Sequence, residues 1–180
     1  QWSSSAASDV YKRQMSTRSR IGILQKDLSV KSVYHHWDGY PEWLGVTLEK
    51  QYNTEEKVAK LIDGGNMSSC WSDNQYDEEK QEYVKNDPRP EYYGGDDERP
   101  HNNESIQDFL KDANMSEEFL YLFTSNEVIE SNKDNIKGTI FATEGWSAWS
   151  VRPMYDKDYN VLNTDVTPVK IPAWDVADDS

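Results

Sequence analysis

The stretch YHHWDGYPEWLG, residues 34–45, decides the fold because it marks the place where a strand ends and a helix begins. The segment VKSVYHHW (30–37) is rich in β-branched and aromatic residues, which predicts a strand. Asp38 and Gly39 form a strong turn pair, since glycine accepts a positive φ and an aspartate side chain bonds the local backbone. Pro41 fits the first turn of a helix. The stretch therefore predicts a strand, a tight corner and a helix in that order.

A β-hairpin and an amphipathic helix follow from the residues around this corner. RIGILQ (20–25) alternates, with Ile21 and Ile23 on one face, and we expect it to pair with residues 30–37. After the corner, the predicted helix of residues 41–52 carries a single apolar stripe. That stripe consists of Leu44, Leu48 and Tyr52.

A second helix follows at once, and its start and stop signals are the clearest in the chain. Either Asn53 or Thr54 caps its N-terminus, and the pair Gly64 and Gly65 ends it. Its buried stripe consists of Val58, Leu61 and Ile62. The choice between the two caps stays open at the level of the sequence.

The second half of the chain is expected to hold one more short helix and several strands. Ser105 caps the helix, whose apolar face consists of Ile106, Phe109 and Leu110. Residues 117–131 indicate a strand, a Ser-Asn turn and a return strand, and residues 137–144 and 145–153 indicate two more strands. A last edge strand would contain Val166, Val169 and Ile171.

Residues 72–104 differ in composition from the rest of the chain. They have almost no aliphatic residues, several prolines and a strong acidic excess, which predicts a long loop or an insertion. The order of the elements indicates an α+β fold, with an N-terminal β-hairpin, two or three short helices and mostly antiparallel C-terminal strands. We expect residues 105–180 to belong to the same domain as residues 15–71, which hold the hairpin and two helices.

The charge of the chain restricts the kind of partner. The 33 acidic and 19 basic residues give a formal net charge of −14, which repels nucleic-acid backbones and anionic membranes. We therefore expect neither direct nucleic-acid binding nor membrane binding, and no apolar run is long enough to span a membrane. Three interpretations of the acidic charge stay open. It could attract a protein partner with a basic patch, imitate the charge of a nucleic acid, or only keep the protein soluble.

Two sites of reaction chemistry are conceivable at the corner. His35, His36, Asp38 and Glu42 are of the types that hold a metal ion. Neighbouring side chains of a strand point to opposite faces, however, so His35 and His36 cannot share one ion without a break in the strand. One histidine with Asp38 and a distant group stays open, but we predict no metal site. His36 with Asp38 is the basis of an acid–base hypothesis. No nucleophile motif or phosphate-binding loop accompanies this pair, so no catalytic residue and no cofactor is predicted.

Aromatic side chains gather at the same corner. Trp37, Tyr40 and Trp43 are suited to stack on a base, a sugar or the side chain of a partner, and Trp146 and Trp149 could add to them. Alternatively, these rings fill the core of a chain that is short of aliphatic residues, with His36 hydrogen-bonded beneath them and His35 in solvent. The composition favours this second interpretation. The candidate residues for binding a ligand or partner are His36, Trp37, Asp38, Tyr40 and Trp43.

Several segments together resemble a family of small, mostly uncharacterised proteins encoded by bacteriophages and prophages. These are SRIGI, YHHWDGYPEWLGVTL, QYNTEEKV, KLIDGG and the later FLYLF (119–123). The resemblance covers residues 18–71 best, with His36 in the histidine position of the family. It implies an origin in a mobile element and, with the single cysteine Cys70, a place in the reducing cytoplasm of a bacterial host cell. It brings no known activity.

The first residues, QWSSSAASDVYKRQ (1–14), resemble the translated adapter sequence that heads some metagenomic gene predictions. We expect them to be a disordered, non-native leader. No apolar run of the kind found in signal peptides is present in the sequence.

Three hypotheses of function follow. The first is a non-catalytic accessory protein of a phage or prophage, which binds and modulates a host protein, for example a defence factor. The alternative is a small-ligand binding protein of the nucleotide type that uses the aromatic corner. The third is a hydrolase that uses His36 and Asp38.

Overall fold

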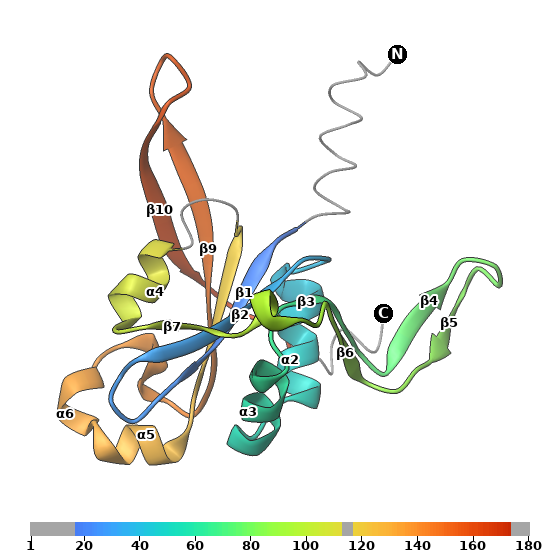
Figure 1. Cartoon of the computed structure of the whole chain (residues 1–180), viewed down its shortest axis with the longest axis horizontal. Helices are drawn as coiled ribbons and strands as arrows, with labels where there is room; N and C mark the ends of the chain where they lie inside the picture. Colours follow the sequence, from blue (N-terminus) through green and yellow to red (C-terminus); the bar gives the residue numbers. More distant parts are fainter. Residues whose placement is uncertain (1–16, 113–116, 174–180) are drawn as a thin grey trace.

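Strand β1 (Ser19–Leu24) lies inside a mixed, eight-stranded sheet. It pairs antiparallel with β2 (Val30–His35), as the predicted hairpin requires, and parallel with β8 (Phe119–Thr124) (Figure 1). The computed structural model describes residues 17–112 and 117–173. The strand order is β10-β9-β8-β1-β2-β3-β6, and β7 also pairs with β2. The other strands are β3 (Met67–Trp71), β4 (Asn74–Asp77), β5 (Glu82–Lys85), β6 (Arg89–Tyr92), β7 (His101–Asn103), β9 (Gly145–Tyr155) and β10 (Val161–Val169).

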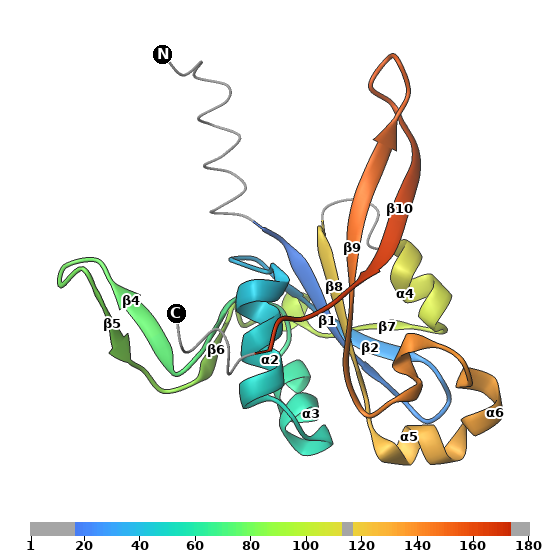
Figure 2. The ribbon, with the colours of Figure 1, turned by 180° about the vertical axis from the view of Figure 1, so that it is seen from behind.

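Short helices cover both faces of the sheet (Figures 1 and 2), which confirms the α+β class. Between β2 and β3 the chain forms a π-helical turn, η1 (Pro41–Gly45), which continues as α2 (Val46–Gln51) and is followed by α3 (Glu55–Asp63). The remaining helices are α4 (Ile106–Asp112), α5 (Asn126–Ser131) and α6 (Lys133–Ile136), with the 3₁₀ turns η2 (Asp96–Glu98) and η4 (Ile140–Ala142). None of the helices within the described ranges is long and apolar enough to cross a membrane.

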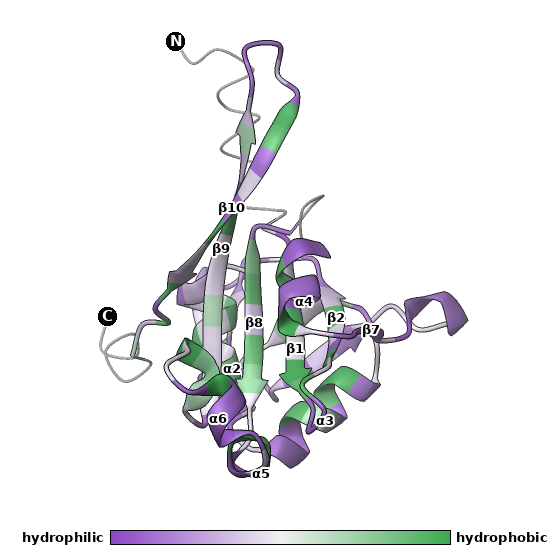
Figure 3. Ribbon diagram, turned by 90° about the vertical axis from the view of Figure 1, so that its left-hand side faces the viewer, coloured by the Kyte–Doolittle hydropathy of each residue, from purple (hydrophilic) through white to green (hydrophobic). Residues whose placement is uncertain are grey.

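Strand β8 supplies apolar side chains to two cores, one on each face of the sheet. Tyr121 and Phe123 belong to the core formed with η1, α2 and α3. Leu120 and Leu122 belong to the core on the opposite face, where they join Phe109 of α4. This follows from the alternation of side chains along a strand. Figure 3 shows β8 as a hydrophobic strand between its neighbours, whereas the turn that joins β9 to β10 is hydrophilic.

The predicted helix signals are confirmed. Thr54, rather than Asn53, caps α3, and its side-chain oxygen accepts a hydrogen bond from the Lys57 N–H at 3.3 Å. Gly65 follows the helix with a φ of +91°, a conformation that favours glycine. The hydroxyl of Ser105 caps α4 in the same way. The stripe residues that become buried are Leu44, Leu48, Val58, Leu61 and Ile62.

Two predictions for the chain after β8 are wrong. The expected return strand is α5, because the Ser125 hydroxyl accepts a hydrogen bond from the Val128 N–H at 3.3 Å and so caps a helix. The strand expected at 137–144 contains η4 instead, after Gly138 at a φ of +81° has turned the chain. The strand expected at 145–153 is β9, and the last edge strand is β10, which contains Val166 and Val169 as predicted but ends before Ile171.

The acidic segment 72–104 contains strands β4 to β7, where the composition indicates a loop. Strand β6 pairs with β3 and β7 pairs with β2, both at the main sheet, while β4 and β5 form a separate hairpin that projects from it (Figure 1). Backbone hydrogen bonds hold these strands, and most of their side chains are exposed, so they need few aliphatic residues. The predicted leader, residues 1–14, lies outside the described residues.

Candidate functional site

Three hydrogen bonds to the backbone hold the corner between β2 and η1. The Trp37 N–H donates to the Ser68 carbonyl at 2.9 Å, and the Gly39 N–H donates to the Thr17 carbonyl at 2.8 Å. The buried Tyr121 hydroxyl donates to the Gly39 carbonyl at 2.7 Å. The corner is therefore tied to β3, to the chain before β1 and to β8.

The conformational roles of the two turn residues, Asp38 and Gly39, differ from those predicted. Asp38, and not Gly39, has the positive φ, +56°, which aspartate adopts more readily than most residues. Gly39 is required for space, because a Cβ there would lie 2.7 Å from the Ser19 Cβ and from the Thr17 carbonyl oxygen. The close approach of the chain to β1 thus depends on the absence of a side chain at residue 39.

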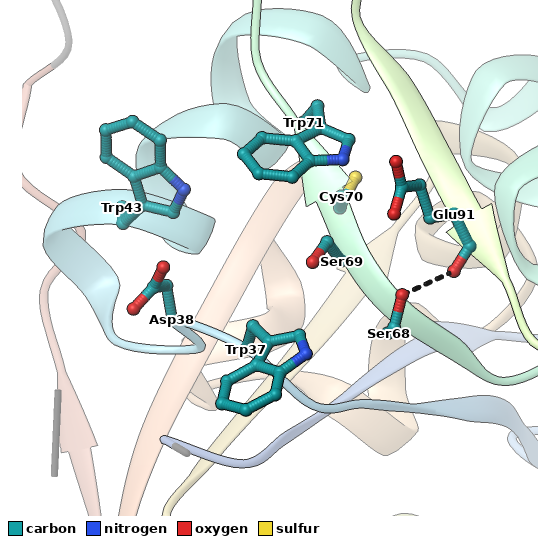
Figure 4. A pocket seen from close by; sticks show the side chains of 8 residues that line it. All are labelled: Trp37, Asp38, Trp43, Ser68, Ser69, Cys70, Trp71 and Glu91. Carbon is teal, nitrogen blue, oxygen red and sulfur yellow. Dashed lines mark hydrogen bonds between the residues drawn. The ribbon is translucent and has the colours of Figure 1, made fainter. Parts of the chain in front are cut away.

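Three tryptophans surround a cavity of about 350 Å³ beside this corner (Figure 4). Trp37 comes from the corner itself, Trp43 from η1 and Trp71 from the end of β3. Two carboxylates face the same space, Asp38 near Trp43 and Glu91 of β6 on the side of Trp71 (Figure 4). The rest of the wall consists of Ser68, Ser69 and Cys70. We call this cavity the tryptophan pocket.

The polar groups in the wall of the tryptophan pocket differ in solvation: Glu91 is exposed, whereas Asp38 is only partly so. Burial raises the pKa of Asp38 above its ordinary value, because desolvation disfavours the charged carboxylate. The indole Nε1 of Trp71 is buried and has no hydrogen-bond partner among the described residues, which is uncommon for a buried donor. None of the eight lining side chains is basic. The pocket therefore combines aromatic surface with negative charge that no lining residue neutralises.

The surroundings of Cys70 do not favour a role as a nucleophile. Its side chain is almost fully buried, and burial raises the pKa of the thiol to about 12. The thiolate is the reactive form of cysteine, and it is scarcely populated at neutral pH with such a pKa.

The two histidines occupy the reverse of their expected places. His35 is 1% exposed in the α2/α3 core, with Nδ1 3.2 Å from the Ser19 hydroxyl, and burial lowers its pKa to about 3. His36 is partly exposed, and its Nδ1 is 2.7 Å from the Tyr34 hydroxyl. The reason is register: His35 lies opposite Ser19 on the face of the sheet that α2 and α3 cover.

His36 and Asp38 do not form an acid–base pair. Partial burial and the positive charge of Arg18 lower the pKa of His36, whereas a neighbouring carboxylate would raise it. The ring of His36 packs edge-on against Trp37, with the centroids 4.4 Å apart, and its hydrogen bond goes to Tyr34. The geometry that a hydrolase needs is therefore not assembled from these two residues.

Of the five candidate binding residues, the tryptophan pocket brings together Trp37, Asp38 and Trp43. His36 and Tyr40 are not among its lining residues. For the three rings at the corner, the interpretation that they fill the core is wrong, because Trp37, Tyr40 and Trp43 remain partly exposed and belong to neither buried cluster. Trp149 is buried in one core, as that interpretation expected, and Trp146 packs against the other. The remaining aromatic rings of the cores are Phe109, Tyr121 and Phe123.

The sequence prediction missed Trp71 and Glu91, which complete the pocket. Trp71 ends the strand MSSCW (67–71), and the signal for it was a short alternating segment directly after the Gly64–Gly65 helix end. Glu91 lies in a segment that composition indicates to be a loop, so nothing in the sequence placed it opposite Ser69 in the wall of the pocket. The pairing of β6 with β3 does so.

Within residues 17–112 and 117–173, no group of three or more His, Cys, Asp or Glu residues is arranged to hold a metal ion. Comparisons with protein-family models, with curated proteins and with solved structures found no significant match for this chain.

The buried His35 predicts a fall in stability in mild acid. Its pKa is about 3 in the folded chain and near 6.5 when unfolded, so its contribution is complete above pH 6.5 and is lost as the pH falls towards 3. We expect the free energy of unfolding, measured with urea, to drop by about 2 kcal/mol between pH 7.5 and pH 5 on account of this residue. Asp38 and Glu49, whose pKa values burial raises, act in the opposite sense.

The measurement is therefore the difference in this pH dependence between the wild type and His35→Gln. His36→Gln is the matched control, because His36 is partly exposed and should carry less of the effect. An unchanged pH dependence in His35→Gln would contradict the assignment.

Proposed function

We propose that this protein is a non-catalytic accessory protein of a bacteriophage or prophage, which binds a host protein in the cytoplasm and modulates it. The tryptophan pocket is the proposed contact. The observation that carries the proposal is the meeting of Trp37, Trp43 and Trp71, all partly exposed, around one cavity. Tryptophan is among the residues most enriched where binding energy concentrates in protein interfaces.

The surface beside the pocket is also suited to a protein partner. Directly after Trp71, the hairpin of β4 and β5 projects from the sheet (Figure 1). It carries Tyr76 and Tyr83, which are 48% and 60% exposed and pack edge-on with their centroids 5.2 Å apart. Exposed tyrosines are typical of interfaces. The net charge of −14 favours a partner that is basic at the contact.

The other two hypotheses have less support. A nucleotide would bring its phosphates towards Asp38 and Glu91, with no basic residue in the pocket wall to offset the repulsion. A hydrolase would need a base and a nucleophile that converge, whereas His36 lies outside the pocket lining and Cys70 is a buried thiol.

Affinity capture from a bacterial lysate tests the proposal, with the full chain as wild type and as two variants. Trp43→Ala removes one wall of the pocket. Tyr155→Ala, at a 56% exposed residue at the far end of β9, is the control. We expect a host protein that the wild type and Tyr155→Ala retain and that Trp43→Ala binds at least tenfold less, since such anchors contribute about 2 kcal/mol or more.

Circular dichroism must first show that Trp43→Ala is folded. Capture of the same set of host proteins by the wild type and by Trp43→Ala would overturn the assignment of the pocket. Failure to retain any specific host protein would count against the function as a whole.

A further inference from the structure

We infer that the tryptophan pocket binds an organic ammonium group, presented by a lysine side chain of the partner protein. This inference rests on the proposed function, because it names the chemistry by which the pocket would recognise its partner.

The aromatic wall of the pocket favours a cation. The face of an indole ring is electron-rich, and tryptophan is the strongest of the aromatic residues in attracting a cation that lies over its ring. Trp37, Trp43 and Trp71 surround the cavity from three separate elements (Figure 4). A group that enters the pocket therefore meets aromatic rings on several sides, the arrangement used to recognise alkylated ammonium groups.

The charge of the pocket also favours a cation. Asp38 and Glu91 line the pocket together with the rings, and none of its lining residues in the described part of the chain is a lysine, arginine or histidine. Asp38 is partly buried, so its charge is weakly screened by water and acts over a short distance on whatever enters. An entering ammonium group gains both the ring contacts and the two carboxylates, whereas an anion would gain neither.

The size of the pocket and the fixed backbone of the corner also suit such a group. About 350 Å³ is at the lower end of the range for small-ligand sites, which suits one side-chain head with part of its stem. The residues that carry the site are fixed by the backbone hydrogen bonds from Trp37 to Ser68 and from Gly39 to Thr17. Binding therefore requires little ordering of the corner, which lowers its entropic cost.

Titration followed by NMR tests the inference on the full chain labelled with ¹⁵N. The probe is choline, and the control is 3,3-dimethylbutan-1-ol, which has the same shape without the charge. We expect choline to shift the indole N–H signals of Trp37, Trp43 and Trp71, assigned through single Trp→Phe variants. The signals of Trp146, whose Nε1 donates to the Tyr52 carbonyl at 2.8 Å, and of the buried Trp149 should not move. The neutral alcohol should bind at least about tenfold more weakly than choline.

The double variant Asp38→Asn, Glu91→Gln removes the charge and keeps the shape. Asparagine tolerates the positive φ of residue 38, and residue 91 is exposed, so the thermal midpoint should stay close to that of the wild type. We expect this variant to bind choline about tenfold more weakly and the neutral alcohol as before. Equal binding of choline and the alcohol by the wild type would overturn the inference, as would shifts spread over all indole signals.

Two further titrations, with peptides, test whether a protein side chain supplies the cation. A short peptide with one lysine should bind in the pocket, and the same peptide with that lysine acetylated should not. Binding of choline without binding of the lysine peptide would overturn the assignment to a protein side chain. If a host protein is captured through Trp43 and neither cation binds, this inference fails while the proposed function stands. If both cations bind and no host protein is captured, the pocket binds an ammonium group as inferred, and the proposed function fails.

Discussion

Gly39→Ala is expected to lower the free energy of unfolding by about 3 kcal/mol, because the added methyl group has no room. Its Cβ would lie 2.7 Å from the Thr17 carbonyl oxygen and from the Ser19 Cβ, and the first of these belongs to the backbone. Relief of the clash requires the corner to move away from β1. That movement breaks the hydrogen bonds of Gly39 with Thr17 and with Tyr121. Urea denaturation followed by tryptophan fluorescence measures the change.

Gly94→Ala is the matched control. A Cβ at Gly94 has no atom within 4 Å, and its only penalty arises from the φ of +75°. We expect a loss of about 1 kcal/mol there. Losses of equal size in the two variants would show that the corner does not depend on close approach at Gly39. Gly39→Ala should also disturb the indole signals of Trp37 and Trp43, which Gly94→Ala should leave unchanged.

Tyr121→Ala is expected to lower the free energy of unfolding by about 4 kcal/mol. The ring is fully buried in the core beneath α2 and α3, and its hydroxyl donates to the Gly39 carbonyl at 2.7 Å. The change removes both the packing of the ring and the anchor of the corner. Tyr121→Phe separates these effects, because it keeps the ring and leaves the carbonyl without its donor, and we expect a loss of about 1–2 kcal/mol.

The control for this series is Tyr155→Ala, at an exposed tyrosine of β9, with an expected change of about 0.5 kcal/mol or less. The prediction on the corner is wrong if Tyr121→Phe loses no more stability than Tyr155→Ala. In that case the hydroxyl contributes nothing beyond the packing of the ring.

The elements whose signals are local could be predicted from the sequence. The hairpin of β1 and β2 follows from alternation on either side of a polar turn, and α3 follows from a cap at Thr54 and a glycine end at Gly65. These signals depend on the conformational preferences of a few neighbouring residues, which can be predicted from the residue types alone.

The elements that were mispredicted depend on partners far away in the chain. The residues of β6 pair with β3 through their backbones, so their side chains carry almost no apolar pattern. The parallel pairing of β1 with β8 joins Ser19 to Phe119, a hundred residues later, and no local pattern shows it. The helix α5 was missed because Ser125 and Asn126 suit a turn and a helix start equally well.

The candidate site shows the same division. By itself the sequence determined that a corner with Trp37, Asp38 and Trp43 lies between a strand and a helix, because a turn pair and an N-terminal proline act locally. Only the tertiary structure decided that the rings face a pocket instead of the core, that His35 is buried while His36 is not, and that Trp71 and Glu91 complete the wall. The physical reason is that a strand pattern fixes which residues share a face, whereas the pairing of strands and the packing of helices fix what that face meets.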